Sequence, residues 1–256
     1  MGLIHSDKKS AVHLIELLIC EGIRDFIISP GSRNAPLINE LVHRKTKGIR
    51  LYSIIDERSA AFYALGMALK THRPVVVVCT SGSALLNYLP AVSEAFYQQV
   101  PLIVISADRP YYRIDTGEGQ TIRQQGALKN FLRGEMNIPL DEEQDNYPGL
   151  DGEINKIIRL SSNPSPGPVH INIEFEEPLY QQTNQIDLTT IQSNINHTNS
   201  VSNTPLIKQN IEVFDSTPKI MFLCGQMRQN KELEGLLIEF SERANCIVLC
   251  ETTANL

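Results

Sequence analysis

Short apolar runs that alternate with helix-like segments restrict this chain to a small set of folds. The most strand-like run is Val75–Cys79, and Leu102–Ser106 is another continuous apolar run. A further strand is expected at Val169–Ile173. Unbroken apolar runs are typical of strands that are buried on both faces, as in parallel sheets covered by helices. The pattern therefore predicts an α/β fold, with a parallel sheet and helices on both of its faces.

Polar or glycine-rich segments follow four of the expected strands directly. They are Pro30-Gly31-Ser32-Arg33, Asp56-Glu57, Thr80-Ser81-Gly82-Ser83 and Ala107-Asp108-Arg109-Pro110. In open parallel sheets, ligands bind beyond the carboxyl ends of the strands. The sequence therefore predicts a functional site at this edge, to which Arg33, Glu57, Ser81 and Arg109 contribute.

Glu57 is expected where a strand passes into a helix with a small-residue face. Alanines recur at positions 60, 61, 64 and 68, which is helical spacing. Such a face allows close approach to another backbone or to a flat ligand. An acid in the first turn of a helix is also favoured by the helix dipole, by roughly 0.3–1 kcal/mol, which is the alternative explanation for Glu57.

Composition argues against several classes of protein. The 256 residues are 42% hydrophobic and 20% charged, with a formal net charge of −6, so no basic excess indicates a nucleic-acid partner. No apolar run has the length of a membrane span, and the first residues lack the apolar core of a signal peptide. The five cysteines form no C-x-x-C pair. We therefore expect a cytoplasmic protein with reduced thiols.

The chain divides by composition into three parts. Residues 1–180 carry the predicted sheet, and residues 181–204 are rich in Gln, Asn, Thr and Ser, as in a polar linker. Residues 205–256 contain a strand, a helix and a second strand, and the sequence stops directly after that strand. We expect this last part to be the truncated beginning of a second α/β domain.

Two local expectations concern the ends of elements. A helix that runs to about Glu21 has Ser6 or Ser10 as its candidate N-cap. The acidic run Asp141-Glu142-Glu143 is expected to be a solvated face.

Five motifs occur here in an order that belongs to a known family. They read ISPGSRNAPL, DERSAAFYALGMA, VVVVCTSGSALLNYLPAVSEA, ISADRP and GQTIRQQG. In this order they resemble the thiamine diphosphate-dependent 2-succinyl-5-enolpyruvyl-6-hydroxy-3-cyclohexene-1-carboxylate synthases of menaquinone biosynthesis. The resemblance is strong over about residues 28–126 and continues weakly to the end of the chain.

The resemblance implies the N-terminal portion of an enzyme about twice as long. It consists of a pyrimidine-binding domain and the start of the family's central domain. The family's GDG…N signature for the cofactor diphosphate and Mg²⁺ (manganese being the other metal) is expected in a C-terminal domain absent from this chain. Gly149-Leu150-Asp151-Gly152 lacks the spacing of that signature. We therefore assign no metal ligand here and expect the fragment alone to be inactive.

The resemblance also implies roles for single residues. Glu57 is the catalytic residue, which hydrogen-bonds a ring nitrogen of the cofactor's aminopyrimidine. Pro30, Ser81 and Gly82 complete the cofactor-binding set beneath that ring. By motif match, Ser32, Arg33, Arg109 and Gln120 bind the substrates, isochorismate and 2-oxoglutarate. A homodimer or a dimer of dimers is implied as well.

Several alternatives stay open at the level of sequence. If Arg109 does not bind a substrate, its guanidinium is expected to pair with Asp108 or Glu118. If Arg33 does not bind one, its side chain is expected to be solvated at the surface. Gly119 departs from relatives that carry a polar side chain there, while Arg123 and Gln124 receive no role. The whole protein is alternatively another thiamine diphosphate-dependent 2-oxo acid decarboxylase or synthase, or a non-catalytic anion-binding α/β module.

Overall fold

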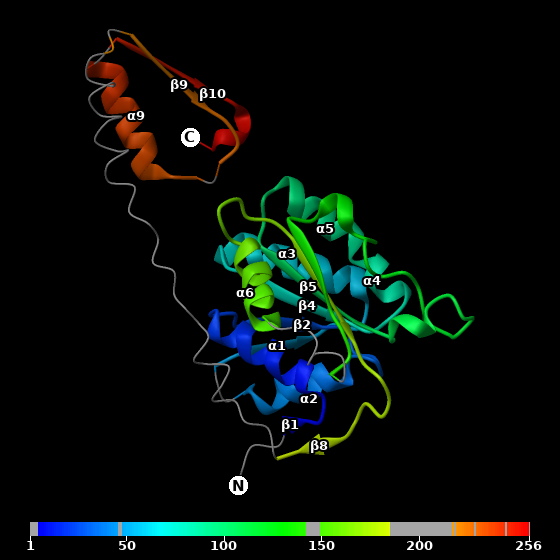
Figure 1. The fold of residues 1–256 in the computed structure, drawn as a ribbon. Helices are drawn as coiled ribbons and strands as arrows, with labels where there is room; N and C mark the ends of the chain where they lie inside the picture. Colours follow the sequence, from blue (N-terminus) through cyan, green and yellow to red (C-terminus); the bar gives the residue numbers. More distant parts are fainter. Residues whose placement is uncertain are drawn as a thin grey trace. The chain divides into compact units, whose positions relative to one another are not determined.

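The computed structural model describes residues 5–45, 48–141, 149–184, 217, 219–227, 229–243 and 245–255. The chain forms two compact units, Met1–Asn196 and His197–Leu256 (Figure 1). Most of the segment predicted as a linker, residues 181–204, lies outside the described residues, so its character stays a prediction.

A six-stranded sheet forms the centre of the first unit, with the strand order β3-β2-β4-β5-β7-β6. In that order the strands are Arg50–Ser53, Asp25–Ile28, Val75–Cys79, Leu102–Asp108, Val169–Glu174 and Gly134–Ile138. Every neighbouring pair is parallel. The prediction of a parallel sheet from its apolar runs is confirmed.

Helices cover both faces of this sheet (Figure 1). One face packs against α1 (Lys9–Cys20), α2 (Ala35–His43) and α6 (Leu150–Leu160). The other packs against α3 (Glu57–Thr71), α4 (Ser83–Asn87) and α5 (Leu89–Tyr97). Two hydrophobic cores result, one on each side of the sheet, as expected for strands with no solvated face.

The N-terminus of α1 differs from the prediction. Lys8 precedes the helix and neither Ser6 nor Ser10 caps it. Instead, the carboxylate of Asp141 accepts the backbone N–H groups of Lys9, at 2.7 Å, and Ser10, at 2.9 Å. Asp141 is half-buried, and its carboxylate takes the place of an N-cap because the helix end supplies two unpaired donors and the positive end of the helix dipole. Glu142 and Glu143 lie outside the described residues.

A short antiparallel pair joins distant parts of the first unit. Strand β1 (His5–Ser6) pairs with β8 (Gln182–Thr183), which lies in the segment predicted as a linker. His5 Nδ1 lies 3.0 Å from Glu40 Oε1, and Arg44 Nε donates to the same oxygen at 2.6 Å. These buried polar contacts fix the position of the N-terminal strand on α2.

The described part of the second unit contains a β-α-β motif. Strands β9 (Ile220–Cys224) and β10 (Cys246–Cys250) are parallel, and α9 (Lys231–Arg243) connects them. The predicted strand-helix-strand order is confirmed. All five cysteines of the chain are free thiols.

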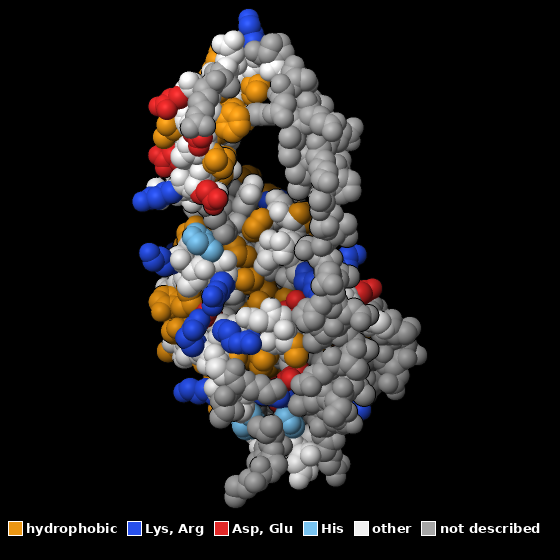
Figure 2. Space-filling model, turned by 90° about the vertical axis from the view of Figure 1, so that its left-hand side faces the viewer, with side chains coloured by type: hydrophobic (Ala, Val, Ile, Leu, Met, Phe, Trp, Pro, Cys, Tyr) orange, Lys and Arg blue, Asp and Glu red, His pale blue; other side chains and the backbone are white. Residues whose placement is uncertain are grey.

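Hydrophobic side chains reach the surface in both units, and on the first unit they lie among Lys and Arg side chains on the face in Figure 2. Among the described residues, no helix combines the length and the apolarity needed to cross a membrane.

Candidate functional site at the carboxyl edge of the sheet

Four adjacent strands bring the sequence-predicted site residues to one edge. Glu57 follows β3, the segment Pro30–Arg33 follows β2, Ser81 and Gly82 follow β4, and Arg109 follows β5. These strands are consecutive neighbours in the sheet, so the segments converge although they are up to about 80 residues apart in sequence. Their roles toward ligands stay predictions.

Glu57 is the first residue of α3 and is half-buried. Asp56 is the N-cap, and its carboxylate accepts the backbone N–H of Ser59 at 2.8 Å. The predicted small-residue face is confirmed: the alanines at 60, 61, 64 and 68 are fully buried. Because Asp56 provides the cap, the Glu57 carboxylate is not needed for that purpose.

The negative charge of Glu57 acts at the end of β4. Burial raises the pKa of the Cys79 thiol far above its ordinary value, and the charge of Glu57 raises it further. Burial also raises the pKa of the Tyr88 phenol, with smaller contributions from Cys79 and Glu57. The Glu57 carboxylate therefore lies near the strand end from which the Ser81–Gly82 turn starts.

Tyr88 is a buried polar group that the sequence did not single out. Its hydroxyl donates to Ser29 Oγ at 3.3 Å, and Ser29 Oγ donates to the carbonyl of Ile54 at 3.0 Å. This chain of hydrogen bonds connects α4–α5 with the ends of β2 and β3. These hydrogen bonds hold the ends of β2 and β3, after which Pro30 and Glu57 follow, in fixed positions.

The loop after β2 is held by Asn34 and by close packing. The Asn34 side chain donates to Ser29 O and accepts from Gly31 N, both at 2.9 Å. A Cβ at Gly31 would lie 2.5 Å from Thr80 Cβ, so the loop touches the segment after β4 directly. Pro30 and Ser32 are exposed, so both can meet a ligand from outside the sheet.

The turn after β4 requires glycine. Gly82 has φ +87° and ψ −148°, a conformation that residues with a side chain almost never adopt. A Cβ there would also lie 3.1 Å from the carbonyl oxygen of Gln120. The backbone of the predicted cofactor-side turn at Gly82 thus contacts the backbone of Gln120, the predicted substrate-side residue. Gln120 itself is exposed.

Arg33 is buried, with 4% of its surface exposed, so the alternative of surface solvation is wrong. Its Nη1 donates to the carbonyl of Phe175 at 2.9 Å, and its Nη2 lies 3.2 Å from Glu177 Oε1. Burial lowers the pKa of Arg33, and the positive charge of Arg109 lowers it further. Two guanidinium groups therefore lie near each other at this edge.

Arg109 is paired with Glu118, as one of the sequence alternatives proposed. Its Nη1 lies 3.0 Å from Glu118 Oε1, and its Nε donates to Gly119 O at 3.1 Å. Asp108 does not pair with the guanidinium; its carboxylate accepts the Arg109 backbone N–H at 2.8 Å. Gly119 thus contributes its carbonyl to the site.

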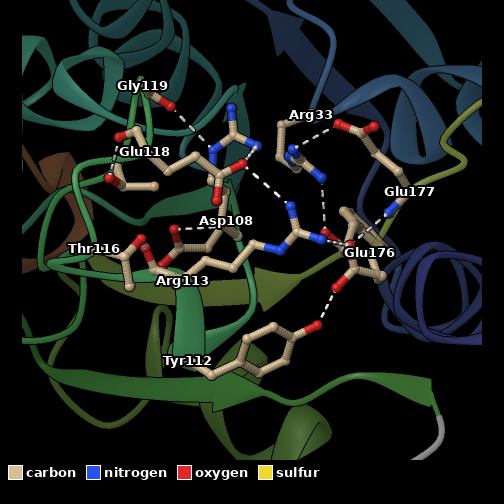
Figure 3. A network of polar contacts seen from close by, with 12 residues as sticks. Arg33, Asp108, Tyr112, Arg113, Thr116, Glu118, Gly119, Glu176 and Glu177 are labelled. Carbon is tan, nitrogen blue, oxygen red and sulfur yellow. Dashed lines mark hydrogen bonds and ion pairs between the residues drawn. The ribbon is translucent and has the colours of Figure 1, made fainter.

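A third arginine joins this network (Figure 3). Arg113 contacts Glu118 at 3.2 Å and Glu176 at 2.6 Å, and Tyr112 donates to Glu176. The sequence analysis did not identify Arg113, which lies in the short helix η2 (Tyr111–Arg113). Arginine and glutamate side chains alternate here, so the guanidiniums are close together without strong repulsion.

A second group of polar residues lies buried below this network, on strands. Ser106, Asp108, His170, Asn172 and Glu174 occupy alternate positions of β5 and β7 and are nearly inaccessible to solvent. The sequence signal was available, because VHINIE alternates apolar and polar residues in the strand expected at Val169–Ile173.

The residues at this edge fit an aminopyrimidine cofactor. A half-buried carboxylate, an exposed proline, and a glycine turn that permits close backbone approach are the groups needed to bind a flat, polar ring. Among the residues that the structure describes, no cluster of three or more His, Cys, Asp or Glu could hold a metal ion.

Comparison with known proteins identifies the same region. The family model for the thiamine pyrophosphate enzyme, N-terminal TPP binding domain, matches residues 8–130. This range contains Pro30, Glu57, Gly82 and both arginines, Arg33 and Arg109.

Relatives with one shared name match most of the chain. The 2-succinyl-5-enolpyruvyl-6-hydroxy-3-cyclohexene-1-carboxylate synthase of Flavobacterium johnsoniae is 43% identical over 250 residues, which are 96% of this chain and 43% of that protein. The protein of that name from Flavobacterium psychrophilum is 41% identical over 96% of this chain and 43% of that protein. The one from Christiangramia forsetii is 39% identical over 95% of this chain and 44% of that protein. The chain spans less than half the length of these relatives. Over the matched region, it belongs to the thiamine pyrophosphate enzymes as their N-terminal, cofactor-binding domain.

Proposed function

We propose that this chain is the pyrimidine-binding part of a synthase of menaquinone biosynthesis. The full-length protein would join the four-carbon unit left when 2-oxoglutarate loses CO₂ to isochorismate, by 1,4-addition. One observation carries the proposal: two arginines, Arg33 and Arg109, lie at the same sheet edge as Glu57 and the Gly82 turn. Both substrates are polyanions, and arginine is the side chain best suited to bind carboxylates.

The residues of this edge have separate tasks in the proposed reaction. Bound thiamine diphosphate supplies the carbanion chemistry. Glu57 holds a proton at a ring nitrogen of the pyrimidine, while the backbone at Pro30, Ser81 and Gly82 supports the ring. Arg33, Arg109, Ser32 and Gln120 orient the substrate carboxylates and hydroxyl groups.

The remaining partners are part of the same proposal. Mg²⁺ would bind with the cofactor diphosphate outside this chain, and the active protein would be a homodimer or a dimer of dimers in the cytoplasm.

A coupled assay on the full-length protein tests the proposal. It contains 2-oxoglutarate, isochorismate, thiamine diphosphate and Mg²⁺, with loss of isochorismate absorbance as the readout. Consumption that requires all four components supports the proposal. Cofactor binding without consumption would contradict the substrates and indicate another thiamine diphosphate-dependent decarboxylase or synthase.

A competition experiment separates these enzymes from an anion-binding module. ATP and thiamine diphosphate both carry phosphates, but only the second has an aminopyrimidine that can pair with Glu57. Preferential binding of thiamine diphosphate over ATP supports an enzyme of this cofactor class. Equal binding of the two would contradict it.

A further inference from the structure

Gln124 is a buried side chain in an otherwise exposed loop. Its neighbours Arg123 and Gln125 are exposed, whereas Gln124 has no accessible surface. Burying an amide is costly unless its donors and acceptor are all satisfied. Its contacts therefore indicate what its position stabilises.

Each polar atom of the Gln124 carboxamide is used. Oε1 accepts the backbone N–H of Gly82 at 2.7 Å, and Nε2 donates to Asn172 Oδ1 at 2.8 Å and to Ala107 O at 3.3 Å. One side chain thus connects the turn after β4 with the strands β5 and β7.

The Gly82 end of this connection has a conformation open only to glycine. Glycine adopts φ +87° without strain but is flexible, so a contact is needed to fix the turn in one conformation. Its N–H is held by Gln124, and its α-carbon faces the backbone of Gln120. A shift of the Gln124 carboxamide would therefore move Ser81–Gly82 and Gln120 together.

The other end reaches Arg109 through two buried groups. Asn172 Nδ2 donates to Asp108 Oδ2 at 2.9 Å, and Asp108 Oδ1 accepts the Arg109 N–H at 2.8 Å. Asn172 Oδ1 also accepts from Ser106 Oγ at 2.7 Å, and its Nδ2 also donates to Asn137, so its orientation is fixed on both sides. A continuous series of hydrogen bonds joins Gly82 to Arg109.

We propose that Gln124 is a positioning residue that sets the cofactor-side turn at Gly82 in a fixed relation to the substrate-side Arg109. It touches neither ligand; it acts through Gly82 on one side and through Asn172 and Asp108 on the other. The inference rests on the proposed function for the roles of Gly82 and Arg109. It adds a residue to which the family motifs assigned no role.

Three variants of the full-length protein test this role: Gln124→Ala, Gln124→Glu and the exposed neighbour Gln125→Ala as the matched control. Gln124→Ala leaves the Gly82 N–H without its acceptor, so hydrogen exchange of that amide should accelerate. The Kd of thiamine diphosphate should rise about tenfold, the effect of one lost hydrogen bond. Gln125→Ala should change neither quantity.

Gln124→Glu gives a pH signature that a merely structural role would not give. The glutamate keeps an acceptor for Gly82, but its second oxygen faces Asn172 Oδ1 and Ala107 O, which are acceptors. Protonation restores a donor there. The ratio of the variant's thiamine diphosphate Kd to the wild-type Kd should therefore fall toward one as pH decreases, whereas the ratio for Gln124→Ala should stay constant.

The outcomes separate the inference from the proposed function. A wild-type protein that binds thiamine diphosphate but consumes no isochorismate would contradict the proposed substrates, and the Kd comparison would still decide the role of Gln124. Gln124 variants that lose thermal stability but keep the wild-type Kd and Gly82 exchange would overturn the positioning role. Absence of thiamine diphosphate binding by the wild type would overturn both.

Discussion

Arg109 Nη1 and Glu118 Oε1 are 3.0 Å apart, and the same Glu118 oxygen lies 3.2 Å from Arg113. The carboxylate of Glu118, labelled in Figure 3, thus pairs with the Arg109 guanidinium, to which the proposed function assigns a substrate carboxylate. An incoming anion must compete with Glu118 for this arginine. The affinity for anionic substrates therefore depends on Glu118 as well as on Arg109.

Glu118→Gln should strengthen the binding of an anionic substrate. The glutamine keeps an oxygen that can accept from Arg109, but it removes one negative charge from the site. Since the pair is partly exposed, the gain should be about 1 kcal/mol, or about a fivefold lower KM for isochorismate or 2-oxoglutarate. Steady-state kinetics at low and high salt measure this, with the exposed Glu94→Gln as control. An unchanged or higher KM for both substrates would show that Glu118 does not compete.

Glu57→Gln should reduce turnover to below a few per cent without a loss of fold. The variant removes the proton-holding carboxylate, while the cap of α3 comes from Asp56. The thermal midpoint should change little, because the dipole interaction contributes only about 0.3–1 kcal/mol. Asp56→Asn is the matched control, since asparagine caps as well as aspartate and should retain activity. Comparable losses in both variants would mean that helix distortion, not the Glu57 carboxyl, causes the defect.

The sequence predicted those features that depend on local pattern. The unbroken run at Val75–Cys79 is a buried central strand, because only such a strand can bury every side chain. The strand-to-helix change at Glu57 followed from the acidic pair Asp56-Glu57 and the alanine spacing after it. Since parallel strands end at one edge, the convergence of the candidate site segments followed as well.

Features that depend on distant partners could not be predicted in this way. The carboxylate that caps α1, Asp141, is 132 residues from the Lys9 N–H that it accepts. Arg33 is buried because its partners, Phe175 and Glu177, follow β7, more than 140 residues later. In the sequence, Gln124 cannot be told from the other polar residues of its loop; only the fold brings its side chain to the Gly82 N–H. In each case a polar partner far away in the sequence, rather than the residue's own segment, decides which contacts the side chain makes.

The Asp108 carboxyl should give a measurable pH dependence of stability. Burial raises its pKa to about 6, against the opposing hydrogen bonds from Asn172 and the Arg109 N–H. Because this value is above the unfolded pKa of about 4, the folded state binds more protons between these values, and its stability falls as pH rises through that window. Urea unfolding at pH 4.5 and 6.5 should show a loss of about 2 kcal/mol that Asp108→Asn lacks. An equal pH difference in both proteins would contradict the raised pKa.

Gly31→Ala should destabilise the fold through one identified contact. Its Cβ would lie 2.5 Å from Thr80 Cβ and 2.7 Å from Thr80 Cγ2, so the loop after β2 would be pushed away from the turn after β4. Overpacking of this kind costs roughly 1–3 kcal/mol. Gly66→Ala in α3 is the control: its Cβ meets no atom within 4 Å, and helix propensity should stabilise it by about 0.5–1 kcal/mol.

A double-mutant cycle with Thr80→Gly assigns that cost to the contact. Thr80→Gly removes the three atoms nearest to the new methyl group, although it also removes the hydroxyl that accepts the Arg33 N–H. The double variant should therefore be more stable than the sum of the two single losses, by at least about 1 kcal/mol of coupling. Additive losses would mean that the cost of Gly31→Ala does not come from the contact with Thr80. A coupled result would show that the Arg33 loop and the Gly82 turn are positioned by direct contact with each other.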